Sequence, residues 1–284
     1  MYDNYMQLWA KKSLGQHFLT DKQVILDIIA CSNIEKGENV LEIGPGTGVL
    51  TKALLEAGAK VYAFEKDDRA ITILQNEFKN ELVNGTFTLF HEEYRNTNAE
   101  NLKQIGLSSG KFKIIANIPY YITGKIVSHA LENDLQPKEM VLMVQKEVAE
   151  RIVAEDGKES ILSLSVKLFG TPKIVRHVSR HSFRPPPDVE SSVISISSIN
   201  NEFFSANNLD FPQVFRLIKA GFAHKRKILI KNLSEEINKA DQNIKISNLN
   251  EIWSELGFNQ NTRAEELDTE TWKNLILKIL KSGK

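Results

Sequence analysis

The stretch "NVLEIGPGTGVLT", residues 39–51, decides the fold of this chain. An apolar strand runs directly into a loop with Gly44, Gly46 and Gly48, and a segment with helical spacing follows. A glycine turn between a strand and a helix is typical of α/β proteins that bind a nucleoside-containing ligand there. The pattern here is G-x-G-x-G preceded by Glu42, whereas dinucleotide-binding proteins carry G-x-G-x-x-G. This difference favours a ligand that has no pyrophosphate.

Strands and helices alternate on both sides of this loop, from about residue 21 to residue 145. Apolar runs predict strands at 39–43, 60–65, 86–91, 111–116 and 139–145. Helical spacing predicts helices at 21–32, 48–58, 68–78, 98–105, 124–133 and 146–154. Because strands this apolar are typical of sheets buried on both faces, we expect a parallel sheet covered by helices on each side. Such sheets bind ligands beyond the carboxyl ends of their strands.

Beyond this alternation, the sequence predicts one more helix and two more strands. Residues 160–170 have the pattern of a helix closed by Gly170. Residues 173–178 and 191–197 predict two strands that pair antiparallel around a proline-rich loop.

The composition changes again near residue 200. Residues 200–209 are polar and rich in asparagine, as in a linker, and everything from Phe211 onward has helical spacing. We therefore expect an α/β domain at 1–200 and a smaller all-helical domain at 210–284.

The overall composition indicates a globular, intracellular protein. Of its 284 residues, 42% are hydrophobic and 25% are charged, which is ample material for a large core. The single cysteine, Cys31, excludes a disulfide framework and a multi-cysteine zinc site. The first residues do not read as a signal peptide, and no apolar run approaches the roughly 18 residues of a membrane span. We expect a cytoplasmic protein that acts without a membrane.

The formal net charge is zero, yet basic residues are concentrated in two tracts that contain no acid, 160–187 and 211–234. Such tracts indicate a surface for a polyanion even on a neutral protein. Solvated helix faces and loops are the alternative for each tract taken alone. The candidate contacts to nucleic acid in these tracts are Arg180, Arg184, Lys225, Arg226 and Lys227.

The glycine loop fits S-adenosylmethionine, which carries an ammonium, a carboxylate and a sulfonium but no phosphate. Glycines permit the close backbone approach that such a ligand needs. Glu65 ends the second strand, 21 residues after Gly44, at the spacing of a carboxylate that accepts from both ribose hydroxyls. Glu93, after the third strand, is a candidate acceptor for the adenine amine, and Glu92 is nearly as well placed. The alternatives are a solvated strand-end carboxylate and a surface acid pair.

The segment "KIIANIPYYITG", residues 113–124, ends a buried strand on Asn117 and continues with Pro119 and two tyrosines. The side-chain oxygen of Asn117 and the Ile118 carbonyl suit the two N–H groups of an aromatic amine. Held in this way, the nitrogen becomes pyramidal and its lone pair is freed to attack a methyl group. Pro119 fixes the turn and Tyr120 offers a stacking face for the base. The alternative is an Asn-Pro turn that ends a strand, with a packed tyrosine.

Several motifs occur in the order found in one family. They are "SLGQHFLTD", "EIGPGTGVLT", "NIPYYIT", "VQKEVAERIVA", "FRPPPDVESSV", "GFAHKRKILIKNL" and "RAEEL". Together they cover nearly the whole chain, which resembles the small-subunit ribosomal RNA adenine dimethyltransferases that are responsible for kasugamycin sensitivity. The resemblance implies an α/β fold, with the Rossmann-like sheet of class I S-adenosylmethionine-dependent methyltransferases and a smaller all-helical C-terminal domain. It also implies that the N-terminal segment "SLGQHFLTD" closes over the cofactor.

The resemblance also implies roles for individual residues. The target adenine would lie between Tyr120 and Phe183, with its amine held by Asn117 and the Ile118 carbonyl. Two positions depart from the family pattern: Asp is usual where Glu93 aligns, and many members have Asn where His17 stands. The residues implied to contact S-adenosylmethionine are His17, Leu19, Gly44, Gly46, Glu65, Glu93 and Asn117.

The activity implied by the resemblance is the transfer of two methyl groups to each of two adjacent adenines in a hairpin near the 3′ end of 16S ribosomal RNA. Family members act late in assembly of the small subunit, so its ribosomal RNA and the pre-assembled subunit are the expected partners of a monomeric enzyme. The target adenine would have to leave its stack, and the basic tracts would hold RNA phosphates.

Two other readings remain open from the sequence. The macrolide-resistance methylases of large-subunit ribosomal RNA share the glycine loop and the Asn-Pro-Tyr motif, but they are usually more basic and shorter at the C-terminus. The prolines at 185–187, the "RAEEL" segment and the neutral isoelectric point favour the small-subunit enzymes. A ribosome-assembly or RNA-binding factor with incidental catalysis is the second alternative, and an intact Asn-x-Pro-Tyr motif argues against that as the sole role.

Overall fold

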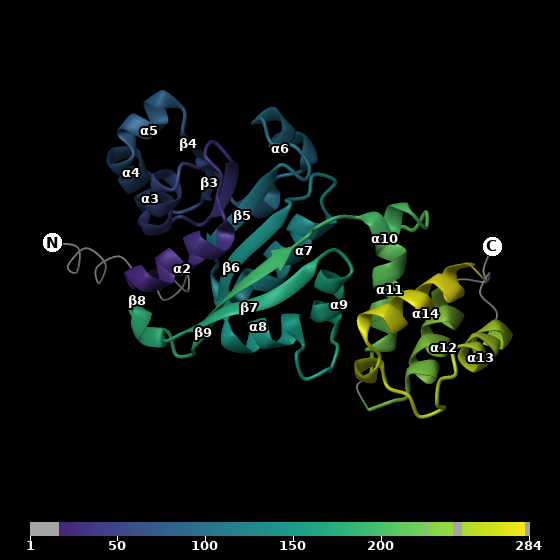
Figure 1. The fold of residues 1–284 in the computed structure, drawn as a ribbon. Coiled ribbons are helices and arrows are strands. Elements are labelled where there is room, and N and C mark those ends of the chain that lie inside the picture. The colour runs from purple at the N-terminus through teal and green to yellow at the C-terminus, as the bar shows by residue number, and fades with distance from the viewer. Residues whose placement is uncertain (1–16, 225, 241–245, 282–284) are drawn as a thin grey trace. The chain divides into compact units, whose positions relative to one another are not determined.

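The computed structural model describes residues 17–224, 226–240 and 246–281, and contacts group the chain into two compact units (Figure 1). The first unit holds the chain up to Ala149 together with Gly170–Asn200, and the second holds Glu150–Phe169 and the chain from Asn201 onward. We expected residues 150–169 to belong to the α/β domain. Instead they group with the C-terminal helices.

The first unit is built on a sheet whose seven described strands follow the order β4-β3-β2-β5-β6-β9-β7. The strands of this unit are β1 (Phe18–Leu19), β2 (Asn39–Ile43), β3 (Lys60–Glu65), β4 (Phe87–His91), β5 (Phe112–Asn117), β6 (Glu139–Gln145), β7 (Thr171–Val178), β8 (Phe183–Arg184) and β9 (Ser191–Ser197). β2 to β6 run parallel, and β9 pairs antiparallel with both β6 and β7. The predicted parallel sheet and the predicted antiparallel pair are therefore confirmed.

Helices precede, connect and follow the parallel strands, and the last of them runs into the second unit from Glu150 onward. They are α2 (Lys22–Ser32), α3 (Val49–Glu56), α4 (Asp68–Glu77), α5 (Lys79–Asn84), α6 (Ala99–Gln104), α7 (Thr123–Glu132) and α8 (Lys146–Val153). The sequence left open whether Thr20 or Asp21 begins the first helix. Asp21 does so, because its carboxylate accepts hydrogen bonds from the backbone N–H groups of Gln23 and Val24.

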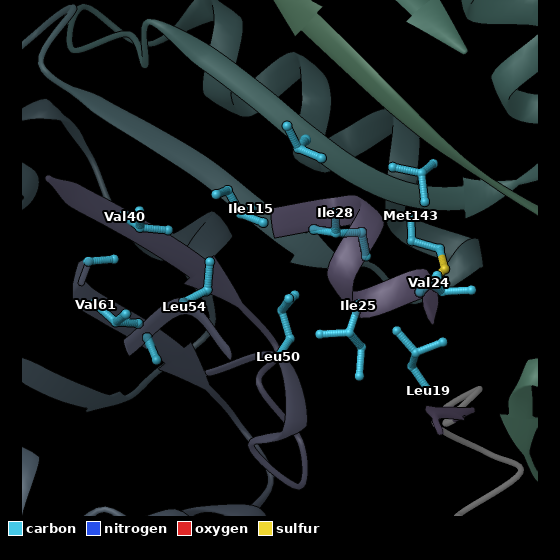
Figure 2. Close-up of a cluster of buried hydrophobic side chains, with 14 of the residues drawn as sticks. Leu19, Val24, Ile25, Ile28, Val40, Leu50, Leu54, Val61, Ile115 and Met143 are labelled. Atoms are coloured by element: carbon cyan, nitrogen blue, oxygen red, sulfur yellow. The ribbon is translucent and has the colours of Figure 1, made fainter. Parts of the chain in front are cut away.

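Side chains of the sheet are buried on both faces, as the apolar strands predicted. Val40, Val61 and Ile115 pack with the α2 and α3 side chains in one cluster (Figure 2). The alternate residues of the same strands, such as Leu41 and Ile114, point to the opposite face and are also fully buried. Figure 2 also places Leu19, from β1, beside the α2 side chains of this cluster.

The second unit is helical and its core contains Trp272, which is almost wholly buried. A Cβ at Gly221 would lie 2.5 Å from the Trp272 ring, so only glycine fits where α11 ends against that ring. The helices of this unit are α9 (Ile161–Lys167), α10 (Glu202–Ser205), α11 (Phe211–Gly221), α12 (Leu229–Ala240), α13 (Ile246–Glu255) and α14 (Thr269–Lys281). No helix in the described part of the chain is long and apolar enough to cross a membrane.

The buried carboxylate of Glu159 is one of the contacts that join residues 150–169 to the C-terminal helices. Its Oε1 accepts hydrogen bonds from Lys167 Nζ at 2.7 Å and from Thr269 Oγ1 at 3.2 Å. Its backbone N–H donates to the Glu265 carbonyl at 3.0 Å. The "RAEEL" segment and the start of α14 therefore hold the segment that precedes α9.

Two local predictions were wrong. The expected linker at 200–209 contains the short helix α10, and Phe204 within it is buried against the Phe169 ring, 4.8 Å between centroids. Gly170 does not close α9, which ends at Lys167. A Cβ at Gly170 would lie 2.8 Å from the Ser197 carbonyl oxygen, so this glycine permits a close approach of two backbones.

Candidate active site

A pocket in the first unit lies beyond the carboxyl ends of β2, β3, β4 and β5. The strand order reverses between β2 and β5, and ligands of open α/β sheets bind at such a switch point. Four loops line it, at 43–50, 65–67, 92–94 and 117–122, together with His17, Phe18 and Leu19. The pocket therefore brings together loops that are far apart in the sequence.

The glycine loop lines the pocket and leaves open space beside its own backbone. Gly44 and Gly46 adopt φ values of +67° and +56°, which other residues rarely adopt. Nothing lies within 4 Å of a Cβ built at Gly44, whereas one built at Gly46 would lie 3.1 Å from the Phe18 ring. Phe18 therefore closes on the loop at Gly46, and the open space at Gly44 lets a ligand approach the backbone.

Glu65 is held rigidly at the end of β3 by backbone donors. Its Oε2 accepts from the Gly46 N–H at 3.1 Å, and its Oε1 accepts from the N–H groups of Lys66 and Asp67, both at 2.8 Å. The side chain is almost fully buried. This carboxylate therefore links the glycine loop to the end of the next strand, where we expect the ribose.

Glu42 is a buried acid that also lines the pocket. Its carboxyl accepts a hydrogen bond from Thr51 Oγ1 at 2.7 Å. Burial raises the pKa of Glu42 to about 8, the nearby charge of Glu65 adds to the rise, and the Thr51 hydroxyl opposes it. Glu42 is therefore protonated in the folded protein below that pH.

The charges of the lining fit the cationic groups of S-adenosylmethionine. Among the described residues, five carboxylic acids line the pocket, at positions 42, 65, 67, 92 and 93, and Lys66 is the one lysine. Two of the acids already have basic partners, since Asp67 pairs with Arg69 and Glu93 pairs with Arg95. Of the other three acids, Glu42 is neutral below about pH 8, so Glu65 and Glu92 are the ones that favour an ammonium and a sulfonium in the pocket.

Asn117 ends β5 at the edge of the pocket, and its side-chain Nδ2 donates to the His17 carbonyl oxygen at 3.4 Å. The next residue, Ile118, is buried, and its N–H donates to the Met143 carbonyl at 3.2 Å. Pro119, with φ −56°, leads into the 3-10 turn Tyr120–Ile122. The motif is therefore anchored by β6 on one side and by His17 on the other.

Tyr120 is held at both its hydroxyl and its ring. The hydroxyl lies 2.5 Å from Ser191 Oγ, at the start of β9. The ring stacks on the His17 imidazole with 6.0 Å between centroids and 19° between planes. Burial raises the pKa of Tyr120, so its hydroxyl stays protonated at neutral pH. Its position is therefore fixed before any substrate arrives.

Residues 17–20 form a strap across the pocket, here called the N-terminal strap. Its two-residue strand β1 pairs antiparallel with β8, Phe18 opposite Arg184 and Leu19 opposite Phe183. His17 Nδ1 donates to the Pro185 carbonyl at 2.9 Å. The Thr20 N–H donates to the Ser182 carbonyl at 2.9 Å. The strap is therefore fastened along its whole length to the segment 182–185.

The structure brings the residues predicted to contact the cofactor into one lining: His17, Leu19, Gly44, Gly46, Glu65, Glu93 and Asn117. It does not decide between Glu92 and Glu93, because both line the pocket. Glu93 is half-buried and paired with Arg95, whereas Glu92 is exposed.

Phe183 is the predicted site residue that the structure does not bring to the pocket. Its ring is fully buried in the hydrophobic cluster that also contains Leu19 and Ile25. Because β8 pairs with β1, the Phe183 side chain packs in the core beneath the strap, and neither face of its ring is accessible to an adenine.

The predicted RNA contacts are distributed over both units. Arg180 and Arg184 are exposed in the first unit, Arg180 at the start of the 3-10 turn Arg180–Ser182 and Arg184 in β8. Arg226 and Lys227 belong to the second unit, where Lys227 pairs with Glu235 at 2.8 Å. Lys225 lies outside the described residues. Arg180 and Arg184 therefore lie near the strap, whereas Arg226 and Lys227 lie in the helical unit.

Sequence reasoning missed several residues that shape the pocket. Phe18 lies on the glycine loop, Thr51 donates to Glu42, and Ser191 holds Tyr120. Lys66 and Tyr121 form a contact at the pocket, 3.3 Å between Nζ and the hydroxyl. Only Tyr121 carried a signal in the sequence, because a second aromatic directly after Asn-x-Pro-Tyr is unusual in a plain turn.

Comparisons with known proteins agree with this geometry. A family model described as "Ribosomal RNA adenine dimethylase" matches residues 8–278. The "Ribosomal RNA small subunit methyltransferase A" of Dehalococcoides mccartyi is 37% identical over 271 residues, covering 95% of this chain and 88% of that protein. The protein of the same name from Lactobacillus helveticus is also 37% identical, over 92% of this chain and 88% of its own length.

Solved structures give the same result. A dimethyladenosine transferase from Plasmodium falciparum superposes with a TM-score of 0.78 at 28% identity, covering 94% of this chain and 98% of that one. The 23S ribosomal RNA methyltransferase ErmE superposes with a TM-score of 0.69 at 19% identity, over 92% and 99% of the two chains, which shows a shared fold.

These matches confirm the fold class expected from the motifs, a class I methyltransferase sheet followed by helices. They also confirm S-adenosylmethionine as the methyl donor of the proteins this chain resembles. A family model that spans almost the whole chain, supported by relatives over more than nine tenths of it, places the chain in the ribosomal RNA adenine dimethylase family.

Proposed function

We propose that this chain transfers methyl groups from S-adenosylmethionine to the exocyclic amines of two adjacent adenines in a 3′-terminal hairpin of 16S ribosomal RNA, giving dimethyladenosines. One observation carries the proposal. Asn117 turns its Nδ2 to the His17 carbonyl, which leaves Oδ1 as the end able to accept from a substrate amine. Relatives named for methylation of small-subunit ribosomal RNA support this choice of substrate.

The cofactor would be held by the glycine loop and by the acids around it. Gly44 admits a ligand to the backbone, and Glu65 lies where it can accept from the ribose hydroxyls. The carboxylate of Glu65 gives the pocket a negative potential that suits a cationic ligand, whereas Glu42 is protonated at neutral pH. S-adenosylmethionine supplies a methyl group bound to a positively charged sulfur.

Asn117 would prepare the nucleophile. Its Oδ1 and the Ile118 carbonyl accept the two N–H groups of the target amine, and the nitrogen lone pair then leaves conjugation with the purine ring. The nitrogen forms its bond to the methyl carbon as the carbon–sulfur bond breaks and its electron pair goes to sulfur. The amine, now cationic, gives up a proton to water, so no strong base is required. Holding both groups in line supplies much of the remaining rate enhancement.

Tyr120 would receive the base. Its hydroxyl is fixed by Ser191, so the ring is oriented before the adenine arrives. Stacking on an aromatic ring is worth roughly 1–3 kcal/mol per base, which helps to offset the cost of extracting the adenine from its stack.

The basic residues would hold the RNA backbone, largely independently of sequence. Arg180 and Arg184 are exposed beside the strap, and Lys225, Arg226 and Lys227 would add contacts from the helical unit. We propose that the chain acts in the cytoplasm, as a monomer, on pre-assembled small subunits. A methylase of large-subunit RNA would share the fold, but the relatives named above favour the small subunit.

Methyl transfer to two substrates tests the proposal. Small subunits from cells that lack this protein are incubated with the chain and labelled S-adenosylmethionine, in parallel with naked large-subunit RNA. We expect label on two adjacent adenines of the small-subunit RNA only. Label confined to the large-subunit RNA would overturn the choice of substrate, and label in neither would overturn the activity.

A further inference from the structure

Tyr121 is the exposed aromatic side chain at the mouth of the pocket. Of the large hydrophobic residues in the described parts of the chain, four are exposed: Leu26, Val83, Tyr121 and Val189. Tyr121 is the aromatic member of this group and the one that lines the pocket, with 57% of its surface exposed. It sits in the 3-10 turn Tyr120–Ile122, whose other two residues are anchored or buried. The ring is therefore presented to solvent by a fixed backbone.

A cation accompanies this ring. Lys66 directly follows β3, and its Nζ donates to the Tyr121 hydroxyl at 3.3 Å and lies 6.0 Å from the ring centroid. The neighbouring carboxylates are otherwise engaged: Glu65 accepts three backbone N–H groups and Asp67 pairs with Arg69. Within the described residues, Lys66 forms no ion pair with a carboxylate. Its charge is therefore available to a ligand.

The two side chains together offer two kinds of contact. The Tyr121 hydroxyl accepts from Lys66, so its own proton remains to be donated, and the ammonium retains two further N–H groups. These donors suit a phosphate, and the exposed ring suits the flat face of a base. A base and a phosphate within reach of one another are the parts of a nucleotide. A protein partner that bound through an apolar surface would make no favourable contact with the Lys66 ammonium.

We propose that Tyr121 and Lys66 form a subsite for the nucleotide next to the target adenine in the same RNA strand, with its base on the Tyr121 ring and a phosphate on Lys66. The inference rests on the proposed function. Tyr120 and Tyr121 both line the pocket and Tyr121 is exposed, so this ring lies within reach of a nucleotide joined to an adenine held by Tyr120. The subsite thereby holds the second of two adjacent adenines while the first is in the pocket.

Fluorescence of a modified RNA tests the subsite directly. A hairpin RNA with two adjacent adenines carries 2-aminopurine, whose fluorescence is quenched by stacking, in place of the adenine beside the target. The full chain is added to this RNA and the fluorescence of the probe is recorded. RNA binding is followed by anisotropy, and cofactor binding is measured by calorimetry. Tyr121→Phe keeps the ring, Tyr121→Ala removes it, and Lys66→Gln removes the charge.

The expected results separate the two contacts. The unsubstituted chain and Tyr121→Phe quench the probe, and Tyr121→Ala does not and binds the RNA about tenfold more weakly. Lys66→Gln lowers the slope of log affinity against log salt by about one. Cofactor affinity stays within about twofold in all three variants.

Two control variants remove an exposed apolar side chain and a lysine that lie outside the pocket. Val83→Ala removes a more exposed apolar side chain, and Lys273→Gln removes a lysine that lies 5.8 Å from the Phe203 ring in the second unit. Neither control is expected to change quenching. Equal quenching by Tyr121→Ala, or a loss of cofactor affinity as large as the loss of RNA affinity, would overturn the subsite and leave the proposed function standing. A chain that binds no hairpin and methylates no small subunit would refute both.

Discussion

The carbonyl oxygen of His17 accepts a hydrogen bond from the side-chain amide of Asn117, 3.4 Å away, across a sequence separation of 100 residues. Because a carbonyl oxygen only accepts, the Nδ2 end of the amide must face the strap. The Oδ1 end is then the one that faces a substrate. The N-terminal strap, which also lines the cofactor pocket, thereby sets the orientation of the amide that we propose as catalytic.

Replacement of Asn117 tests this role most directly. Asn117→Ala removes the acceptor, and Asn117→Asp places a carboxylate against the His17 carbonyl, so both variants should lose at least about a hundredfold in turnover. Cofactor affinity, measured by calorimetry, should fall only modestly. Asn201→Ala, an exposed asparagine that makes no side-chain cap, is the control. Turnover near normal in Asn117→Ala would refute the role of the amide.

The fastening of the strap is the subject of a second prediction. Ser182 Oγ donates to Asp21 Oδ2 at 2.8 Å, and this bond lowers the pKa of Asp21. Ser182→Ala removes the bond and leaves Asp21 as the cap of α2. A typical hydrogen bond contributes about 1 kcal/mol, so the free energy of unfolding should fall by about that amount, and cofactor affinity should weaken by up to about fivefold where the strap loosens. Ser254→Ala, a helical serine of the second unit, should change neither quantity; an unaltered affinity in Ser182→Ala would show that the strap needs no such bond.

Glu42 predicts a pH dependence of stability. The folded protein keeps its proton up to about pH 8, whereas the unfolded chain releases it near the ordinary pKa of 4.5. The free energy of unfolding should therefore fall as pH rises through this window, by up to about 1.4 kcal/mol per pH unit, and level off above it.

Glu42→Gln isolates this contribution, because the amide oxygen still accepts from Thr51 and carries no charge. Urea unfolding at pH 6, 7, 8 and 9 should show a flatter profile for this variant and greater stability than the unsubstituted chain at pH 9. Parallel profiles for the two proteins would mean that Glu42 is ionised in the folded state.

The helical unit yields a prediction about salt. Neutralising Lys225, Arg226 and Lys227 together should weaken RNA binding and reduce the slope of log affinity against log salt. Lys227→Gln alone should have less effect than Arg226→Gln, because Lys227 already pairs with Glu235. Binding is measured between 50 and 300 mM salt, a range chosen to define the slope. A slope that the triple variant leaves unchanged would remove these residues from the RNA surface.

The sheet was predictable from the sequence because its strands are apolar runs between clear turns. Four of the predicted strands, 39–43, 60–65, 139–145 and 191–197, have the observed bounds. The glycine loop, Glu65 and Asn117 were placed correctly because each ends a parallel strand, and such ends meet at one edge.

The strap was not predictable in the same way. β1 and β8 have two residues each and show no periodicity, and their pairing joins positions about 165 residues apart. Phe183 was assigned to the adenine by resemblance, but that pairing directs its ring into the core. Tertiary contacts likewise decided where residues 150–169 belong, among them the hydrogen bonds to the buried carboxylate of Glu159 and the packing of Phe169 on Phe204.

The pairing of β1 with β8 has a consequence for synthesis of the protein. A nascent chain that ends before residue 182 already contains the glycine loop, Glu65 and Asn117, but it lacks the segment 182–185, to which the backbone of residues 18–20 and the His17 ring are hydrogen-bonded. Competence to bind the methyl donor should therefore appear abruptly, only once the ribosome has extended the chain past the Arg184–Pro185 segment. Translation itself would thus time the first appearance of a working pocket.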